Sequence, residues 1–232
     1  RCRSKIKDPE TGNVLELDIF LPDINVAIEC DGIYYHSYNF GTNDNYHLMK
    51  TRLCEEVGIR LIHITDWEWN NKRDICQSII ASALGAFQER IYARQCQVKE
   101  VSNKDATDFL NNNHIQSYIN ASIKLGLYYK DELVQIITLG KSRFKKGEYE
   151  LLRMCTKLNT QVIGGFSKLM SHLPSYIDEV ISYVDRSKFT GNGYINSGWT
   201  LIGETRPGYS YYKGNNKYSR QQCQKHKLKD FL

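Results

Sequence analysis

The sequence predicts an α/β protein of two domains, and three observations lead to that prediction. Short apolar segments that alternate as β-strands do are separated by segments whose apolar residues recur at helical spacing. The 232 residues, 41% of them hydrophobic, suffice for one large or two small cores. Residues 1–97 hold 11 Lys and Arg against 14 Asp and Glu, whereas residues 98–232 hold 20 against 12. We therefore predict domains at 1–96 and 97–213, followed by a basic tail at 214–232.

Composition and patterning exclude several classes of protein. No apolar run approaches the roughly 20 residues that cross a bilayer, and the N-terminal residues lack the apolar core of a secretory signal. We therefore expect a cytoplasmic protein with no membrane partner and no obligatory protein partner. The seven cysteines are scattered singly, without the paired spacing of a zinc finger, which favours reduced thiols over a structural zinc site.

A β-hairpin opens the first predicted domain. Residues 14–20 (VLELDIF) alternate apolar and acidic side chains, as a half-buried strand does. The residues LPD mark a turn, and residues 25–30 (NVAIEC) form a second apolar strand that ends at Asp31 and Gly32. The two strands are expected to pair, with acidic residues near their ends.

Two helices and a third strand complete this domain. A helix over residues 45–57 ends at Gly58, a residue suited to a helix C-terminus. A strand at 59–64 (IRLIHI) follows, and a longer helix over 74–94 covers the sheet. The predicted inward side of the first helix comprises Leu48, Thr51, Leu53, Cys54 and Val57, and that of the second comprises Ile75, Ile79, Ile80, Ala83, Leu84 and Phe87.

The second predicted domain is a series of strands with two short helices. A strand at 97–101 precedes a helix at 104–112 that Ser102 caps. The remaining elements are, in order, strands at 121–129 and 133–140 joined by a turn at Lys130 and Asp131, a strand at 149–155, the pair Gly164 and Gly165 heading a helix at 166–173, a strand at 180–185, a glycine-rich turn at 191–193, and strands at 200–204 and 209–213.

Four acidic residues near the ends of the first two strands predict a divalent metal site. Side chains two apart on a strand point to the same face, so Glu16 pairs in this way with Asp18, and Glu29 with Asp31. Such crowding of like charge is unfavourable unless a cation fills it. Carboxylate oxygens with incomplete protein coordination suit Mg²⁺ or Mn²⁺ and leave positions for water and phosphate.

Two further residues are candidates for the same site. His36 follows a short aromatic turn (GIYYHS) and is close enough in sequence to return to the strand ends. An imidazole there acts as a general base, as an acid toward a leaving oxygen, or as a metal ligand. Lys50, on the predicted helix, either holds a scissile phosphate or orients the attacking water. The alternative for both residues is an ordinary polar side chain on a turn or helix surface.

These residues carry a resemblance to a known nuclease fold. The segments ELDIFLP, VAIECDGIYYHS, YHLMKT and EEVGIRLIHI present acids, turn, histidine, helix and strand in the order of the PD-(D/E)xK fold. Within that fold, most of residues 14–80 resemble the Vsr-like group and related phage homing endonucleases. The resemblance implies a restriction-endonuclease-like mixed sheet flanked by helices.

The same resemblance implies roles by position. Asp18 corresponds to the acid of the first strand, Glu29 to the acid of the (D/E)xK element, and His36 to the histidine after the turn. The lysine of that element is replaced here by Asp31. Either Lys50 takes over its role from the helix, or Asp31 and His36 act together as an acid–histidine unit. The expected metal ligands are Asp18, Glu29 and Asp31, and the expected catalytic residues are Glu16, Asp18, Glu29, Asp31, His36 and Lys50.

The implied reaction is hydrolysis of phosphodiester bonds in double-stranded DNA. A bound Mg²⁺ or Mn²⁺ lowers the pKa of a water molecule, a general base removes its proton, and the metal offsets charge on the phosphate. No Walker-type GxxxxGK[ST] sequence is present, which argues against phosphoryl transfer from a nucleotide. We therefore expect a metal-dependent DNA endonuclease of a bacterial or phage-infected cell.

The order of elements in residues 97–213 resembles the GNAT acyltransferase fold. Gly164 and Gly165 stand where such enzymes bind the coenzyme A pyrophosphate through backbone N–H groups at a helix start. The fuller Arg/Gln-x-x-Gly-x-Gly/Ala signature is absent from TQVIGGFSKL, and a tight turn with a helix cap is the other explanation of the two glycines. A nucleic-acid-modifying acyltransferase therefore remains an alternative function, and we assign no cofactor-binding residues.

Positive charge in the rear of the chain points to contact with DNA. Phage homing endonucleases that resemble this chain couple the nuclease to such a second domain, and cations there meet phosphates whatever the base sequence. A non-catalytic DNA-binding protein is the remaining alternative. The predicted DNA-binding residues are Lys141, Arg143, Lys145, Lys146, Arg153, Arg186, Lys188, Lys213, Arg220, Lys225 and Lys227.

Overall fold

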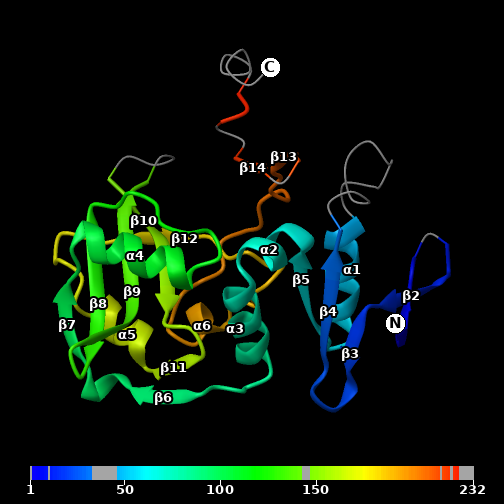
Figure 1. The fold of residues 1–232 in the computed structure, drawn as a ribbon, viewed down its shortest axis with the longest axis horizontal. Helices are drawn as coiled ribbons and strands as arrows, with labels where there is room; N and C mark the ends of the chain where they lie inside the picture. The colour runs from blue at the N-terminus through cyan, green and yellow to red at the C-terminus, as the bar shows by residue number, and fades with distance from the viewer. Residues whose placement is uncertain are drawn as a thin grey trace. The chain divides into compact units, whose positions relative to one another are not determined.

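The chain forms two compact units, each containing mixed α/β structure. The computed structural model describes residues 2–9, 11–32, 46–142, 147–214, 216–219 and 222–224. Unit 1 comprises Arg1–Asn71 with Thr200–Leu232, and unit 2 comprises Lys72–Trp199. Mixed sheets flanked by helices confirm the predicted α/β class (Figure 1).

Two small sheets form the framework of unit 1. β1 (Cys2–Lys7) pairs antiparallel with β2 (Val14–Leu17), whereas β3 (Ile19–Leu21), β4 (Val26–Asp31) and β5 (Arg60–Thr65) form a three-stranded sheet. β4 runs antiparallel to β3 and parallel to β5. The predicted hairpin and third strand are therefore confirmed, but the first predicted strand is divided into β2 and β3.

A tight turn fixes the register of the β3–β4 hairpin. It is a single turn of 3-10 helix, η1 (Pro22–Ile24), with proline at its start, where the missing N–H costs nothing. Asn25 closes it in the left-handed conformation, with φ of 52°, and its N–H donates to the carbonyl of Pro22. Ile19 consequently lies opposite Ile28.

Helices α1 (Tyr46–Glu56) and α2 (Asp66–Asn71) belong to the N-terminal part of unit 1. Gly58, with φ of 77°, follows α1 at the predicted stop, because glycine adopts the left-handed conformation without a steric penalty. The core of this unit consists of the buried residues Ile6, Leu15, Leu17, Ala27, Cys54, Ile59 and Leu61.

The long helix predicted over 74–94 is shorter and is followed by a strand. α3 spans Arg73–Ala83, and Gly85 takes a φ of 69° just beyond its end. Residues further along form β6 (Glu89–Tyr92). The extension of the helix to residue 94 was wrong, because apolar spacing continued in the sequence past a glycine that ends the helical run.

A five-stranded mixed sheet forms the centre of unit 2, in the order β12-β10-β9-β8-β7 (Figure 1). Neighbours from β7 to β10 are antiparallel, whereas β12 pairs with β10 in parallel. The strands are β7 (Gln97–Glu100), β8 (Ile123–Tyr129), β9 (Glu132–Lys141), β10 (Tyr149–Thr156) and β12 (Val180–Ser182).

Two features of unit 2 that were predicted from local sequence are confirmed: the turn between β8 and β9 and the cap of a helix. Lys130 and Asp131 both have positive φ, 48° and 64°, which is the turn geometry that matches the twist of the β8–β9 hairpin. The helix α4 (Asn103–Asn113) follows Ser102, whose hydroxyl accepts a hydrogen bond of 3.1 Å from the backbone N–H of Asp105.

Buried side chains pack on both faces of the five-stranded sheet. Helix α5 (Gly165–Met170) contributes Phe166 and Leu169 to one core, and α4 contributes Ala106 and Leu110 to the other. β9 supplies residues to both cores and is buried along most of its length, as a central strand covered on two sides is.

Gly164 and Gly165 form the turn into α5. Gly164 occupies the cap position with φ of 74°, and Gly165 is buried so closely against Gln135 that a side chain there would overlap it. Both glycines thus have structural roles in the turn and cap. The strand before them, β11 (Thr160–Ile163), was not predicted and pairs in parallel with β6.

The predicted glycine-rich turn at 191–193 contains a short helix, α6 (Asn192–Ile195), that begins after Gly191. Its Tyr194 packs edge-on against Phe166 and Trp199, with ring centroids 5.2 and 5.1 Å apart. This aromatic cluster joins α6 to the α5 side of the sheet.

The last strand pair lies later in the sequence than predicted. Residues 200–204 form no strand in the described part of the chain, and Ile202 is 80% exposed. β13 (Tyr211–Lys213) instead pairs with β14 (Asn216–Tyr218). An apolar alternation alone does not make a strand where no neighbour is present to satisfy its backbone groups.

The units divide at a different place from the predicted boundary at 96–97. Residues 72–96 are tied to the second unit by specific hydrogen bonds: the Nζ of Lys72 donates to the carbonyl of Ile115 at 2.7 Å, and Ser78 Oγ accepts from the N–H of Asn159 at 2.9 Å. The pairing of β6 with β11 adds to these. Local sequence patterns do not reveal hydrogen bonds between residues so far apart, so the boundary could not be predicted from them.

Candidate active site

The ends of β3 and β4 bring Asp18 and Glu29 together, as predicted. The antiparallel register that opposes Ile19 to Ile28 sets Asp18 beside Glu29. The backbone N–H of Asp18 donates to Glu29 Oε1 at 3.2 Å, and Asp18 Oδ2 accepts from the backbone N–H of Cys30 at 3.0 Å. These hydrogen bonds hold two carboxylates on adjacent strands in fixed positions.

Lys50 reaches Glu29 from helix α1. Its Nζ donates to Glu29 Oε2 over 2.6 Å, and the two side chains are only 5% and 10% exposed. Helix α1 therefore places the ammonium group of Lys50 on a carboxylate of β4. Because burial removes solvent screening, the charges depend strongly on each other.

Asp31 faces two histidines that sequence reasoning missed. Its Oδ2 lies 3.0 Å from Nδ1 of His63, and its Oδ1 lies 3.5 Å from Nδ1 of His47. The two imidazole rings meet edge-on, with centroids 5.2 Å apart. One potential ligand atom from each of these three residues lies within 4.8 Å of the others, and Asp31, His47 and His63 are the one such group of three in the described residues.

Thr51 fixes the far side of the His63 ring. Its Oγ1 lies 2.9 Å from His63 Nε2 and donates to the carbonyl of His47 at 2.8 Å. His63 is 4% exposed and lies opposite Glu29 in the parallel pairing of β4 with β5. Both ring nitrogens of His63 therefore have a partner, and the orientation of the imidazole is set.

A polar face of α1 turns toward the strands. His47, Lys50, Thr51 and Cys54 are spaced i, i+3, i+4 and i+7, so they lie along one side of the helix. Of the predicted inward residues, Thr51 and Cys54 are buried and Leu53 packs against the core, whereas Val57 is 54% exposed and was wrong. The buried Lys50 was not part of the predicted set. Polar groups on the facing strands select the side that turns inward.

The sequence contains a signal for the missed histidines. His63 is the single polar residue in the last four positions of IRLIHI, a strand that is apolar on both faces. A buried imidazole is costly without a hydrogen-bond partner, so a partner on a neighbouring element was to be expected. His47 precedes Lys50 by three residues and therefore shares its side of the helix.

One predicted catalytic residue stands apart from this arrangement, and another lies outside the described residues. Glu16 lies on β2, opposite Arg3 of β1, and is exposed between two buried leucines. It does not share a strand face with Asp18, because the chain leaves the β1–β2 sheet before β3 begins. His36 lies outside the described residues.

The carboxylates act together on neighbouring thiols. Burial raises the pKa of Cys30, and the negative charges of Asp18, Asp31 and Glu29 raise it further. Burial also raises the pKa of Cys54 to about 11, against the lowering effect of Lys50. Three acids that influence one thiol form a single region of negative potential.

Of the predicted DNA-binding residues, Arg153 is partly buried and Lys188 is buried. The guanidinium of Arg153 donates to the carbonyls of Ser117 at 2.9 Å and Leu152 at 2.7 Å, and burial lowers its pKa. Lys188 is 5% exposed and donates to Ser187 Oγ. Both cationic groups donate hydrogen bonds within the protein, Arg153 to backbone carbonyls and Lys188 to a side-chain hydroxyl. These internal contacts argue against a main role in binding phosphate.

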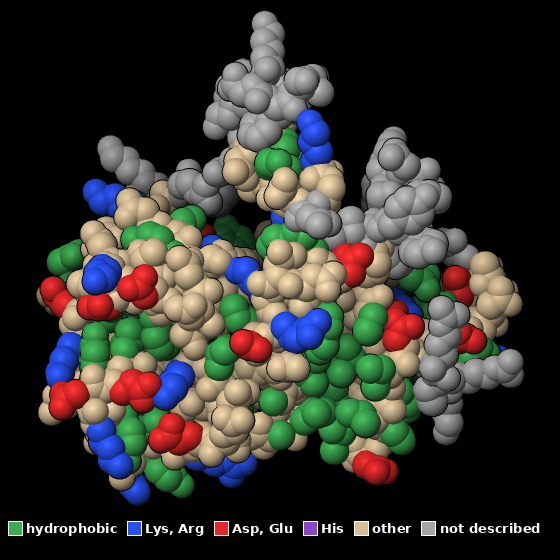
Figure 2. Space-filling model, viewed as in Figure 1, with side chains coloured by type: hydrophobic (Ala, Val, Ile, Leu, Met, Phe, Trp, Pro, Cys, Tyr) green, Lys and Arg blue, Asp and Glu red, His purple; other side chains and the backbone are tan. Residues whose placement is uncertain are grey.

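Other predicted DNA-binding residues are accessible. Lys141, Arg186 and Lys213 are exposed. On the face that Figure 2 draws, Lys and Arg side chains of unit 2 are interleaved with Asp and Glu and do not form a patch of one sign. The remaining predicted residues lie outside the described part of the chain: Arg143, Lys145, Lys146, Arg220, Lys225 and Lys227.

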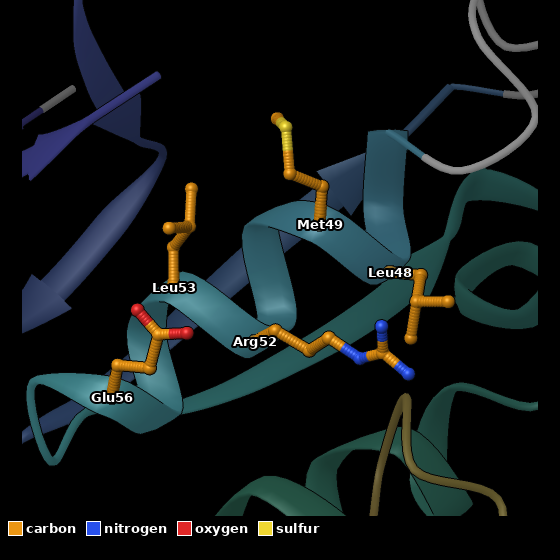
Figure 3. Close-up of a pocket in the computed structure, with 5 residues that line it drawn as sticks. All are labelled: Leu48, Met49, Arg52, Leu53 and Glu56. Carbon is orange, nitrogen blue, oxygen red and sulfur yellow. The ribbon is translucent and has the colours of Figure 1, made fainter. Parts of the chain in front are cut away.

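A hollow of about 410 Å³ lies along the other sides of α1 (Figure 3). It shares no residue with the groups around Glu29 and Asp31, and an exposed cation, Arg52, extends at its edge toward Glu204 with a distance of 2.7 Å. The hollow is lined by Leu48, Met49, Arg52, Leu53 and Glu56. Its shape carries no chemistry of its own, so the side chains at the strand ends define the candidate site.

Comparison with known proteins adds no family assignment. The sequence matches no protein-family model, and no curated protein matches it significantly. None of the described helices is long and apolar enough to span a membrane. The chemistry of the site therefore rests on the residues themselves.

Proposed function

We propose that the chain is a metal-dependent DNA endonuclease whose catalytic residues are Asp18, Glu29 and Lys50. The observation that carries the proposal is the buried contact of 2.6 Å between Lys50 Nζ and Glu29 Oε2, beside a carboxylate on the adjacent strand. Two acids from adjoining segments of the sheet and one amine from the helix beside it are groups that can support phosphodiester hydrolysis. Asp18 and Glu29 are two of the residues that carry the resemblance to the PD-(D/E)xK fold, and in this proposal Lys50 of α1 takes the role of the absent lysine.

The donor set fits a hard divalent cation. Asp18 and Glu29 offer carboxylate oxygens, which are the ligands that Mg²⁺ and Mn²⁺ take in proteins. A cation held there would supply a polarised phosphate and a more acidic water molecule. Asp31, the third metal ligand expected from the sequence, has the two imidazoles as its neighbours instead.

Lys50 has two tasks in this proposal. It offsets the charge of Glu29, so that two carboxylates tolerate each other in a partly buried site. It also presents an ammonium group where negative charge develops on the phosphate, and such fixed charges act most strongly where water is excluded. Removing either Glu29 or Lys50 therefore disturbs both the charge balance and the position of the phosphate.

Unit 2 is proposed to contact double-stranded DNA through its exposed cations. Lys141 and Arg186 are accessible in unit 2, and Lys213 is accessible in the C-terminal part of unit 1. The parallel pairing of β12 with β10 and the glycine pair before α5 are consistent with the GNAT-like resemblance. Both glycines have structural explanations, so we propose DNA contact and no acyl transfer for this unit.

Cleavage of supercoiled plasmid tests the proposal. The protein should convert the plasmid to open-circular or linear forms with Mg²⁺ or Mn²⁺ and leave it intact with EDTA. Asp18→Asn and Glu29→Gln should abolish conversion while keeping DNA affinity within about threefold in a gel-shift assay, since most affinity comes from phosphate contacts elsewhere. Glu56→Gln, an exposed acid on α1, is the matched control and should cleave normally.

Three results would contradict the proposal. The first is an intact plasmid with every divalent metal. The second is cleavage that continues in EDTA. The third is cleavage by Asp18→Asn at the wild-type rate. Loss of DNA affinity in Glu29→Gln with cleavage preserved would also reverse the roles given to the residues.

A further inference from the structure

We propose that Asp31, His47 and His63 form a second metal site, selective for a transition metal such as Zn²⁺ over Mg²⁺. The three residues come from three elements: Asp31 ends β4, His47 lies in the first turn of α1, and His63 lies on β5. They belong to one compact unit. The site is distinct from the carboxylates assigned to DNA cleavage, and its metal binding is measured without DNA.

The spacing of the ligand atoms fits a single ion. Metal–ligand bonds of about 2.0–2.2 Å place neighbouring ligand atoms about 3–3.6 Å apart around the ion. Asp31 Oδ2 lies 3.0 Å from His63 Nδ1, and Asp31 Oδ1 lies 3.5 Å from His47 Nδ1. Each oxygen of the Asp31 carboxylate thus lies near one imidazole nitrogen. One ligand atom from each residue lies within 4.8 Å of the others, so a small movement of the side chains would bring all three around one ion.

The second nitrogen of His63 is anchored, as a ligating imidazole requires. His63 would bind the ion through Nδ1, while Nε2 lies 2.9 Å from the hydroxyl of Thr51. A partner on the remote nitrogen fixes the ring orientation, and such partners are a regular feature of histidine ligands. Thr51 is itself held by the carbonyl of His47, so the two histidines are linked through the helix.

Donor chemistry decides which metal the site prefers. Mg²⁺ takes oxygen ligands and gives up its water reluctantly, whereas imidazole nitrogens suit Zn²⁺, Ni²⁺, Co²⁺ and Fe²⁺. Two of the three donors here are nitrogens. An imidazole nitrogen that binds a metal ion carries no proton, so metal binding at His63 Nδ1 requires that nitrogen to be unprotonated.

Access to the site comes from the side of His47. Its side chain is 37% exposed, whereas those of Asp31 and His63 are 12% and 5% exposed. Three protein ligands leave at least one coordination position, and the exposed side is where water or an anionic ligand would complete the shell. The ion would thus be held by two buried donors and closed by a partly exposed one.

Calorimetric titration of the metal-free full chain with Zn²⁺ tests the inference. A Cys30→Ser background removes the neighbouring thiol, which is itself a potential zinc ligand. We expect one equivalent of Zn²⁺ to bind, and Mg²⁺ at tenfold excess not to displace it. His47→Ala should weaken binding at least tenfold, because it removes a ligand whose side chain is partly exposed and whose loss leaves the fold intact.

Two controls keep the interpretation specific. His172→Ala removes an exposed histidine of unit 2 and should bind Zn²⁺ as the parent does. Glu29→Gln should also retain Zn²⁺ binding, which separates this site from the carboxylates proposed for catalysis. Circular dichroism confirms that each variant is folded. No stoichiometric binding to the parent, unchanged affinity in His47→Ala, or displacement of Zn²⁺ by Mg²⁺ would overturn the inference.

Discussion

Lys50 on helix α1 and Glu29 on β4 form a buried ion pair of 2.6 Å between residues 21 positions apart in sequence. Helix α1 packs Cys54 and Leu53 against the core and also turns a lysine inward. Burying two charges is expensive, and their mutual attraction offsets that cost only while both are present. The pair therefore links the position of α1 to the chemistry of the strand ends.

Breaking this pair should destabilise the fold. Lys50→Met leaves the Glu29 carboxylate buried without its partner, and we expect a loss of about 3–5 kcal/mol in the free energy of unfolding. The double variant Lys50→Met/Glu29→Gln removes both charges and should recover a large part of that loss. Urea unfolding followed by circular dichroism measures both. A single variant as stable as the wild type would show that the pair carries no such constraint.

The thiol of Cys30 reports on the acids around it. Because Asp18, Asp31 and Glu29 add to the effect of burial in raising its pKa, less of the reactive thiolate is present at pH 8. Asp18→Asn should lower that pKa and speed alkylation of Cys30 by iodoacetamide several-fold. Peptide mapping by mass spectrometry follows the modified residue.

Glu16→Gln is the control for this measurement. Glu16 is exposed on β2, and its charge is not among those that shift the pKa of Cys30. The Cys30 rate should therefore stay at the wild-type value. Equal acceleration by both variants would mean that Glu16 belongs to the same electrostatic group, contrary to its position in the fold.

His114 should make unit 2 less stable in acid. Burial, with the nearby charges of Arg153 and Lys72, lowers its pKa to about 3 in the folded state, against 6.5 for an ordinary histidine side chain. Its Nδ1 accepts the N–H of Gln116, as a neutral ring does. Above pH 6.5 the histidine is neutral in both the folded and the unfolded chain, and the stability of the fold is at its full value. As the pH falls from 6.5 toward 3, the unfolded chain binds a proton that the folded chain does not, so the free energy of unfolding decreases.

The variant His114→Asn isolates this effect. The wild type should lose stability relative to the variant by up to about 1.4 kcal/mol per pH unit below pH 6.5. Urea midpoints measured from pH 7 to pH 5 give the difference, in a range where carboxylates still contribute little. Parallel curves for the two proteins would show that His114 does not titrate differently on unfolding.

Arg153 should contribute to the stability of the fold, whereas Arg186 should contribute to DNA binding. Arg153→Met leaves the carbonyls of Ser117 and Leu152 without a buried donor, which we expect to cost about 1–3 kcal/mol of stability. Arg186→Met should leave stability unchanged and reduce the slope of log affinity against log salt for DNA by about 0.9, the effect of one phosphate contact. If Arg153→Met instead kept its stability and lowered the salt slope, Arg153 would be a DNA-binding residue as predicted from the sequence.

Local sequence signals predicted most elements, because their causes are local. The proline and asparagine of the β3–β4 turn, the two residues of the β8–β9 turn and the Ser102 cap each determine backbone geometry within a few residues. The pairing of Asp18 with Glu29 followed from the hairpin in the same way. Elements were lost where a partner far along the chain decides, as for β11 and β6.

Only part of the candidate site could be predicted from the sequence, because some of its contacts join residues that are far apart along the chain. Acids on adjacent strands are brought together by a short turn, so their convergence could be predicted. The inward side of α1 was predicted only in part: Thr51 and Cys54 are buried as expected, but the contacts of Glu29 with Lys50 and of Asp31 with His47 were not foreseen. His63 reaches the site because β5 pairs in parallel with β4, and the local sequence pattern does not specify that pairing.

A double-variant cycle on DNA cleavage decides whether Glu29 and Lys50 work as one catalytic unit. Single-turnover rates of plasmid nicking with Mg²⁺ are compared for the wild type, Glu29→Gln, Lys50→Met and the double variant, at a temperature where all four are folded. Each single variant should lose roughly 100-fold or more in rate, and the double variant should be no slower than the slower single one. A Lys50→Met protein that nicks at the wild-type rate, or losses that multiply in the double variant, would contradict this.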